Sequence, residues 1–402
     1  MDNRLVYVAA IGLVIALVAT AGFSLYHSNT ENYTAKLQTL VESTWANYSA
    51  AYPGFSGGLA MKILTPNGDY FVATGLGSNA TDGIHFRTAS VTKTFTAATI
   101  MMLYQEGKLD IDAKITDNIP GTSNPYVPET ADFAIPYKGE ITIRQLLGHR
   151  AGVFDVDNTA IPKNSTKDYA GQMYVSWVEE TDPYHQFSFD ELVGVVAANN
   201  LSYFKPGASY HYSDTGYSML GKIIERVSNE TYDDFVRVHL LMPNGLTETT
   251  LVSGGNETKL PEPFAPGYSY SGGQVYDTTE DNMSPHVAEG NVITTPADLA
   301  RWGKLLYSGK AGVNSTLVDM MMDVLPFDDQ GHYYGLGTQY TEGLGYGHNG
   351  GNIGYLTLMR YDPKTQFTVV ISADAINFDD LVGQLNFLFN MAREAKQIVG
   401  CS

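Results

Sequence analysis

The sequence predicts an α+β fold with one antiparallel sheet built from both ends of the chain, flanked by helices and interrupted by a mostly helical insert. Segments rich in β-branched and aromatic residues lie near both ends of the chain, at 59–74 and 333–371, and helical spacing dominates between them. Strands at both ends with helices between are typical of a single sheet that carries an insertion. Apolar residues make up 44% of the 402 residues and charged residues only 17%, so the chain can bury a large core.

The N-terminus carries a candidate membrane segment. The 22 residues from Leu5 to Tyr26 contain no charge, and a helix of that length can span a bilayer. The sequence therefore predicts a single transmembrane anchor in residues 1–27, with the rest of the chain outside the cell membrane. The small residues Ala19-Thr20-Ala21 leave a cleaved secretion signal as the alternative. Residues 28–33 are polar and are expected to form a linker.

Residues 34–399 are predicted to form one domain, with sheet portions at about 34–109 and 330–399 and the helical insert at about 110–329. The first portion is expected to hold a helix over 34–52, a hairpin over 59–74, and a helix from about Val91 to Glu106. The capping-box pattern at 188–191 opens one helix of the insert. Strands are predicted again at 333–340, 353–361 and 367–371, and a last helix at about 379–399.

Composition excludes several classes of partner. The net charge of −19 repels nucleic acid, so no nucleic-acid partner is expected. Cys401 is the single cysteine, so neither an intramolecular disulfide nor a cysteine metal site can form, and the histidines show no metal-ligand spacing. No metal and no cofactor are predicted. Nine Asn-X-Ser/Thr sequons agree with an exported domain.

The first candidate catalytic motif is Ser90-Val91-Thr92-Lys93, at the start of a predicted helix. Residues three apart share a helix face, so the Lys93 amine can lie beside the Ser90 hydroxyl. A serine hydroxyl becomes a good nucleophile when a base removes its proton, and a buried lysine can be that base. Alone, the motif is weak, because a capping serine followed by an exposed lysine is a common arrangement.

Two further segments strengthen the signal. Tyr212-Ser213-Asp214 stands between a loop and a helix, and His348-Asn349-Gly350-Gly351 leads into a strand. Glycines in the second segment would let a substrate approach the backbone closely. Each segment also has a plain structural explanation, as a packed aromatic side chain or as a glycine-rich turn.

In this order and at this wide spacing, the three motifs resemble those of the β-lactamase-like serine hydrolases, which include penicillin-binding D-Ala-D-Ala carboxypeptidases, class C β-lactamases and related esterases. Their pattern is Ser-X-X-Lys, then Tyr-X-Asn, then Lys/His-X-Gly. The segments at 143–152 and 289–299 are similar to that family as well. The resemblance covers roughly residues 34–399 and implies a β-lactamase/transpeptidase-like fold.

The resemblance also implies roles. Ser90 would be the acylated nucleophile, Lys93 and Tyr212 would share the general-base role, and the backbone N–H groups of Ser90 and Gly351 would form the oxyanion hole. Asp214, His348 and Gly350 would position the substrate, with His348 toward its leaving side or carboxylate. His149 would hold its loop in place.

Two residues depart from the family pattern. Asp214 replaces the usual Asn, and an ionised carboxylate only accepts hydrogen bonds where an amide also donates. His348 replaces Lys, which suits carboxypeptidases or esterases better than class C β-lactamases. Both departures disfavour efficient antibiotic hydrolysis.

The predicted function is therefore a serine hydrolase that forms an acyl-enzyme with a small D-amino-acid peptide, ester or β-lactam-like substrate outside the membrane. The alternative is a catalytically weak or inactive binding or scaffold protein on the same fold. The sequence gives no prediction of oligomeric state.

Overall fold

The computed structural model describes residues 32–328 and 331–401. The predicted anchor at 1–27 lies outside the described residues, as does most of the predicted linker. Residues 32 and 33, assigned to the linker by the sequence, already belong to a helix that spans 32–50. Within the described ranges, no helix is both long and apolar enough to cross a membrane.

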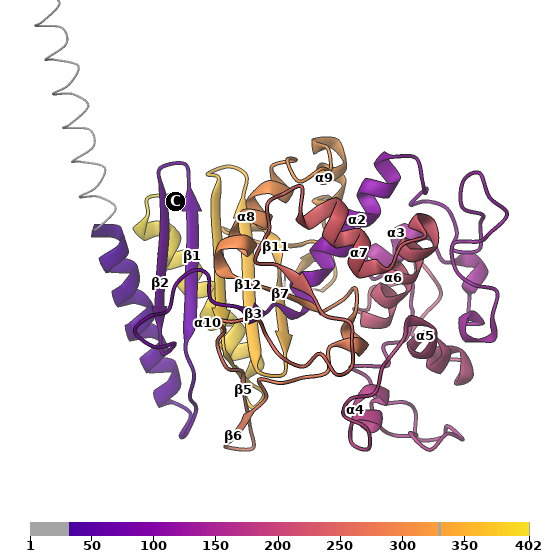
Figure 1. The fold of residues 1–402 in the computed structure, drawn as a ribbon, viewed down its shortest axis with the longest axis horizontal. Coiled ribbons are helices and arrows are strands. Elements are labelled where there is room, and N and C mark those ends of the chain that lie inside the picture. The colour runs from indigo at the N-terminus through magenta and orange to yellow at the C-terminus, as the bar shows by residue number, and fades with distance from the viewer. Residues whose placement is uncertain (1–31, 329–330, 402) are drawn as a thin grey trace, which may run out of the picture.

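The main sheet joins the two ends of the chain, which confirms the predicted fold class. In the part of the chain that the structure describes, it has eight strands in the order β2-β1-β13-β12-β11-β10-β9-β8, and all neighbours are antiparallel. Leu59 in β1 lies opposite Ala373 in β13, so the early hairpin completes a sheet made by the last strands (Figure 1). The strands are β1 (Leu59–Thr65), β2 (Gly68–Thr74), β8 (Leu325–Pro326), β9 (Tyr333–Tyr334), β10 (Gln339–Thr341), β11 (Gly345–Asn352), β12 (Tyr355–Asp362) and β13 (Phe367–Ala373).

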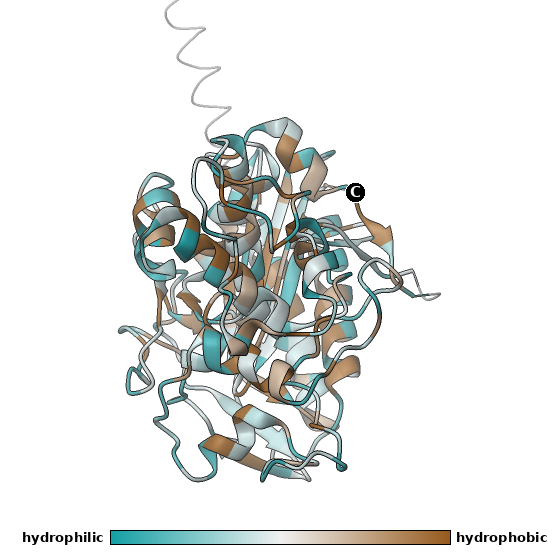
Figure 2. Ribbon diagram, turned by 90° about the vertical axis from the view of Figure 1, so that its right-hand side faces the viewer, coloured by the Kyte–Doolittle hydropathy of each residue, from teal (hydrophilic) through white to brown (hydrophobic). Residues whose placement is uncertain are grey.

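Each face of this sheet is covered by helices. Side chains alternate across a strand, so Ile371 packs into a core with the helix at 32–50 and α10 (Leu381–Ile398), whereas its neighbour Val370 packs into the core of the helical region. On that second side, α8 (Pro296–Tyr307) lies against β1, β12 and β13. The flanking helices carry hydrophobic and hydrophilic residues along their lengths (Figure 2), as expected for elements with one buried face.

The insert lies beside the sheet (Figure 1). Two small three-stranded sheets, β3-β7-β4 and β14-β5-β6, pair strands of the insert with β3 and β14, which lie outside it. The sequence does not predict these sheets because strands of two to four residues show no usable alternation. Ser188 caps α5 through the N–H of Glu191, as predicted. The remaining elements are η1 (Ala89–Val91), α2 (Thr92–Gln105), η2 (Ala131–Phe133), η3 (Lys138–Glu140), α3 (Ile143–Leu147), α4 (Tyr174–Glu179), α5 (Phe189–Ala198), α6 (Asp214–Ser228), α7 (Tyr232–Val236), η4 (Arg237–Leu241), η5 (Ser284–His286), α9 (Ser315–Met321), β3 (Phe86–Arg87), β4 (Thr250–Leu251), β5 (Tyr268–Ser271), β6 (Gln274–Asp277), β7 (Val292–Thr294) and β14 (Ala375–Asn377).

Helix α2 runs through the interior between the sheet and the insert. Its residues from Thr92 to Leu103 are buried, which rigidly fixes the start of the helix. Phe95 stacks on Trp302 of α8 with ring centroids 4.3 Å apart, and the Trp302 indole N–H donates to the Thr94 hydroxyl. Because α2 is packed on all sides, the residues of its first turn are held in one fixed position.

Candidate active site

Ser90 lies in the single turn η1 that leads into α2. The residue before it, Ala89, has φ 48°, a left-handed conformation that costs free energy for a residue with a Cβ atom. Strand β11 presses against this turn at Gly350, where an added Cβ would lie 2.1 Å from the Thr88 carbonyl oxygen and 2.8 Å from the Ser90 nitrogen. Only glycine allows this approach, so the strand that carries Gly350 and Gly351 runs directly beside the Ser90 backbone.

Lys93 lies one turn further on and is completely buried. Its Nζ atom is 3.1 Å from Ser90 Oγ, 2.6 Å from Asp214 Oδ1 and 3.0 Å from Glu289 Oε2. Burial lowers the pKa of Lys93, but the negative groups around it, Asp214 first among them, hold the pKa well above its usual value. Lys93 is therefore an ammonium ion in this arrangement.

Tyr212 stands beside this pair. Lys93 Nζ lies 4.8 Å from the centre of the Tyr212 ring, and the buried Tyr212 hydroxyl lies close to both the Lys93 amine and the Ser90 hydroxyl. Burial raises the pKa of Tyr212 well above its usual value, while the proximity of Lys93 and Ser90 opposes that rise. The structure thus brings the alcohol, the amine and the phenol of the motifs together.

Asp214 occupies the first turn of α6 and binds two partners. One carboxylate oxygen pairs with Lys93, and the other accepts a hydrogen bond of 2.6 Å from Asn158 Nδ2. Burial and the nearby Glu289 carboxylate raise the pKa of Asp214 to about 6, against the opposing effect of Lys93. Asn158 thereby supplies a side-chain amide next to the position where the family pattern has Asn.

His348 is buried, and both of its ring nitrogens bind within the protein. Nδ1 donates to the Asn349 carbonyl at 2.6 Å, and Nε2 accepts from the Tyr334 hydroxyl at 3.0 Å. The Tyr334 oxygen in turn accepts from His149 Nε2 at 3.1 Å, and His149 Nδ1 accepts from the Ser213 N–H at 3.2 Å. Burial and the charge of Lys93 hold the pKa of both imidazoles well below the usual value, so His348 offers a substrate carboxylate neither charge nor a free N–H.

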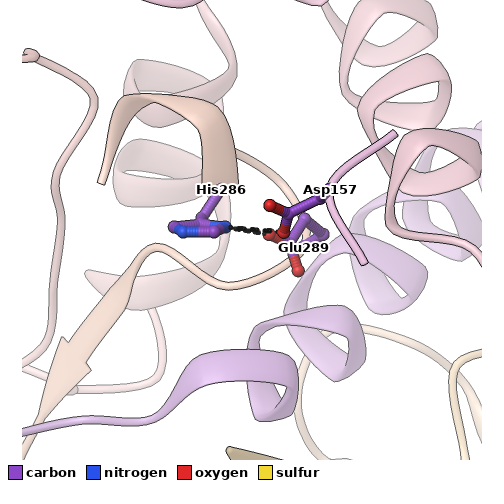
Figure 3. A group of neighbouring side chains, drawn as sticks. All are labelled: Asp157, His286 and Glu289. Atoms are coloured by element: carbon purple, nitrogen blue, oxygen red, sulfur yellow. Dashed lines mark hydrogen bonds and ion pairs between the residues drawn. The ribbon is translucent and has the colours of Figure 1, made fainter. Parts of the chain in front are cut away.

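Beside Lys93 lies a cluster of three residues, Glu289, His286 and Asp157, that was not predicted from the sequence. Glu289 contacts Lys93, and His286 Nδ1 lies 2.6 Å from Glu289 Oε1 and 3.4 Å from Asp157 Oδ2 (Figure 3). The segment around Glu289 was recognised as similar to the family, but nothing in its sequence indicated a contact with Lys93. Asp157 comes from a loop with no pattern of its own, so no sequence signal was available for it.

The motif residues surround one cavity of about 470 Å³. Among the residues described as lining it, two are carboxylates and none is Lys or Arg. Arg360 lies nearby, but it is buried and hydrogen-bonded to Gln339 and Asn349. The lining residues are Ser90, Asp155, Asn158, Thr159, His211, Tyr212, Asp214, Gln339, His348, Asn349 and Gly351.

A serine at a helix start, paired with a lysine and facing a glycine-rich strand of an antiparallel sheet, defines a class of serine hydrolases. The chain belongs to the β-lactamase family, because the family profile described as Beta-lactamase matches residues 55–377. It is 28% identical over 302 residues to penicillin-binding protein 4* of Bacillus subtilis, an alignment that covers 71% of this chain and 60% of that protein. It is 25% identical to penicillin-binding protein 4 of Amycolatopsis lactamdurans, over 72% of each protein.

Two solved structures share the fold. The D-amino acid amidase from Ochrobactrum anthropi, in complex with D-phenylalanine, has a TM-score of 0.71 at 23% identity and covers 91% of this chain and 100% of its own. The D-stereospecific amidohydrolase from Streptomyces has a TM-score of 0.69 at 23% identity and covers 85% of this chain and 94% of its own. At this level of identity the likeness shows the fold.

Proposed function

We propose that this protein is an acyl-enzyme serine hydrolase that cleaves amides or esters of small acyl groups carrying a free amine, such as D-amino-acid amides, esters and short peptides. The observation that carries the proposal is the contact of 3.1 Å between Lys93 Nζ and Ser90 Oγ at a cavity lined by carboxylates. The alternative function, a catalytically inactive scaffold, is disfavoured because the Ser90, Lys93 and Tyr212 side chains of two separate motifs converge at one cavity.

In the proposed reaction, Ser90 Oγ attacks the substrate carbonyl carbon and passes its proton to the base formed by Lys93 and Tyr212. The carbonyl oxygen takes up the negative charge and lies against the backbone N–H groups of Ser90 and Gly351. The proton then moves to the leaving amine or alcohol as the carbonyl–leaving-group bond breaks. Water, deprotonated by the same base, hydrolyses the acyl-enzyme.

Charge supports an amine-bearing substrate. Asp155 and Asp214 reach the cavity, and burial together with the mutual repulsion of these carboxylates raises the pKa of Asp155 well above its usual value. A substrate ammonium group relieves that repulsion, whereas a substrate carboxylate increases it. The solved structures with this fold include proteins named for acting on D-amino-acid amides, which supports the same choice.

β-Lactam antibiotics are expected to be poor substrates, because they carry a carboxylate and the lining of the cavity offers no fixed cation to receive it. His348 stands at the position where the family pattern allows a lysine, but it is neutral and its nitrogens are occupied.

The test is a matched set of substrates. The comparison uses D-alaninamide, L-alaninamide, N-acetyl-D-alaninamide, a p-nitrophenyl ester and nitrocefin, each with the full chain and with Ser90→Ala. We expect kcat/KM for the free amine to exceed that for its N-acetyl form by about 10-fold or more, the size of a new charge-assisted contact, with slow nitrocefin turnover. Equal rates for the free and acetylated amides would refute the amine preference. A chain that no fluorophosphonate or fluorescent penicillin labels would instead support the binding-protein alternative.

We also propose that the catalytic domain acts outside the cell membrane, held there by residues 1–27 or released after cleavage of that segment. The uncharged run from Leu5 to Tyr26 and the nine sequons support this location. Protease added to intact cells should digest the domain if it stays anchored, and N-terminal sequencing of secreted protein would identify a cleavage site.

A further inference from the structure

A second cavity lies outside the active site. Its volume is about 470 Å³, the same as that of the cavity at Ser90, and the two cavities share no lining residue. It is formed where the start of α5, the second half of α6 and the start of α7 meet the loop after β4 and the segment just before Glu289. We call it the acidic cavity, because four of its lining residues are carboxylates: Asp190, Glu225, Asp233 and Glu257.

The negative charge of the acidic cavity is unbalanced. Its described lining includes one cation, Lys222, and Lys222 Nζ pairs with Asp190 Oδ1 at 2.7 Å. The other three carboxylates have no ion-pair partner in the part of the chain that the structure describes. Burial raises the pKa of Glu225 and of Asp233, although hydrogen bonds to both carboxylates oppose the rise. A bound cation would therefore stabilise the ionised form of two carboxylates that the protein leaves without one.

Apolar side chains form another part of the wall. Phe187, Phe189 and Tyr232 are buried aromatic residues of the lining, and Val287 adds an aliphatic side chain. Apolar walls with a few charged groups are typical of a pocket for an organic molecule, whereas a hard metal ion needs converging oxygen ligands. Among the described residues, no three of the carboxylates of the acidic cavity come together closely enough to hold a metal ion. The lining thus fits an ammonium group carried on an apolar body.

Two hydrogen-bonded chains connect the acidic cavity to the backbone of Ala288. Asp233 Oδ1 accepts a hydrogen bond of 3.3 Å from Asn291 Nδ2, and Asn291 Oδ1 accepts one of 3.3 Å from the Ala288 N–H. On the other side of this residue, the Tyr232 hydroxyl bonds to the Thr96 hydroxyl at 2.7 Å, and Thr96 donates to the Ala288 carbonyl at 2.5 Å. Both polar groups of the Ala288 backbone are therefore held, directly or through one partner, by residues that line the acidic cavity.

Ala288 is a strained residue beside the catalytic machinery. Its φ of 71° is left-handed and unfavourable for a residue with a Cβ atom, so this conformation persists only because the surroundings hold it. The next residue, Glu289, places Oε2 3.0 Å from Lys93 Nζ. A cation bound at Asp233 competes with Asn291 for that carboxylate and weakens the hold on the Ala288 N–H. Relaxation of Ala288 then moves the Glu289 carboxylate relative to Lys93.

We propose that the acidic cavity is a regulatory binding site for a small organic cation, an ammonium group on an apolar body, and that its occupation slows acylation of Ser90 through Ala288 and Glu289. The ammonium group binds the Glu225 and Asp233 carboxylates, and the apolar body packs on the aromatic wall. Binding at this cavity is independent of the proposed function, whereas the effect on acylation rests on it.

The test begins with calorimetric titration of phenethylamine into the full chain at neutral pH, with phenethyl alcohol as the matched neutral probe. We expect the amine to bind about 10-fold or more tightly than the alcohol, because only the amine makes a charge-assisted contact. Asp233→Asn and Glu225→Gln, which keep the shape of each side chain, should each weaken amine binding by about 10-fold or more. If one variant does not fold, the other decides.

Asp234→Asn is the matched control. Asp234 follows Asp233 in the sequence, but it is exposed, pairs with Arg237 at 2.6 Å and does not line the acidic cavity, so its variant should bind the amine as the wild type does. Equal binding of amine and alcohol would overturn the inference. Amine binding that neither Asp233→Asn nor Glu225→Gln weakens would place the amine in the active-site cavity and overturn it as well. Tighter binding of Ca²⁺ than of the amine, weakened by the same two substitutions, would make this a metal site instead.

The second measurement is the rate at which a fluorophosphonate probe labels Ser90. Saturating phenethylamine should slow labelling of the wild type by about 5-fold or more, the size of a typical coupling between two sites. In Asp233→Asn the same slowing should need about 10-fold more amine. Amine binding that leaves the wild-type rate unchanged, or slowing at the same concentration in both proteins, would overturn the regulatory role. A wild type that the probe does not label removes the proposed function, and the titrations still decide whether the acidic cavity binds the cation.

Discussion

Replacing Gly350 by alanine should lower the catalytic rate of this protein in a variant that still folds. The added Cβ atom would lie 2.1 Å from the Thr88 carbonyl oxygen, where ordinary van der Waals contact begins at 3.4 Å. Strand β11 and the Ser90 turn must therefore move apart by about 1.3 Å, since neither contact is with a flexible side chain. A displacement of about 1 Å between reacting groups can cost about 10²-fold in rate, or about 2.7 kcal/mol of transition-state stabilisation.

The assay is steady-state hydrolysis of a p-nitrophenyl ester by Gly350→Ala, together with its thermal unfolding. We expect kcat to fall by about 10²-fold with a smaller change in KM, because the Gly351 N–H moves away from the oxyanion while much of the substrate contact remains. Gly139→Ala serves as the control, since an added Cβ there meets no atom within 4 Å. Wild-type kcat in a folded Gly350→Ala would refute the role given to the contact between β11 and Ser90.

Four other substitutions, each at a single residue, give further predictions. Tyr212→Phe should lower kcat by about 10² to 10⁴-fold with little loss of stability, because the ring that packs on His149 is kept. Lys93→Met should in addition lower the free energy of unfolding by about 3 to 5 kcal/mol, since it leaves the buried Asp214 and Glu289 carboxylates without the cation that both contact. Urea unfolding that ranks the two variants in the other order would contradict this. Burial raises the pKa of Asp374 to about 7, so the folded state keeps a proton that the unfolded chain loses near pH 4, and stability should decline from pH 4 to 7. Urea titrations should show a smaller decline of the unfolding free energy between pH 4 and 7 in Asp374→Asn than in the wild type. An equal decline in both would mean that other groups cause it. Trp302→Ala should lower the free energy of unfolding in urea by about 3 to 5 kcal/mol, because it removes the ring stacked on Phe95 of α2 and the hydrogen bond to Thr94. A loss below about 1 kcal/mol would mean that neighbouring side chains move in to fill the cavity.

Much of the fold was predictable because long helices and strands show a clear periodicity of apolar residues in the sequence. The helix predicted from about Val91 to Glu106 is observed as Thr92–Gln105, and the last helix predicted at about 379–399 is observed as Leu381–Ile398. The pairing of the first hairpin with the last strands also follows from strand-like segments at both ends. The small sheets were missed because their strands are only two to four residues long and most of their pairings join segments far apart in the sequence.

The candidate site was predictable only where its residues stand in motifs. Ser90 and Lys93 are three residues apart, so helical geometry alone brings them together, and Tyr212 was placed by the resemblance. The contact between Asp157 and His286 could not be inferred, since the two residues are far apart in the sequence and meet only through folding of the insert. His348 illustrates the opposite limit: its position was expected from the motif, but the occupancy of its two nitrogens depends on Tyr334 and the Asn349 carbonyl.

The pairing of β1 with β13 has a consequence for how the chain folds during its synthesis. A ribosome makes Leu59 more than 300 residues before its sheet partner Ala373, so the early hairpin must wait for the final strands before it gains its neighbour. Contacts of such long sequence separation form slowly, and an incomplete chain exposes the unpaired edge of β1 meanwhile. The turn that carries Ser90, the proposed nucleophile, lies against strand β11 of this sheet, so the candidate active site cannot form before the C-terminal strands have been made.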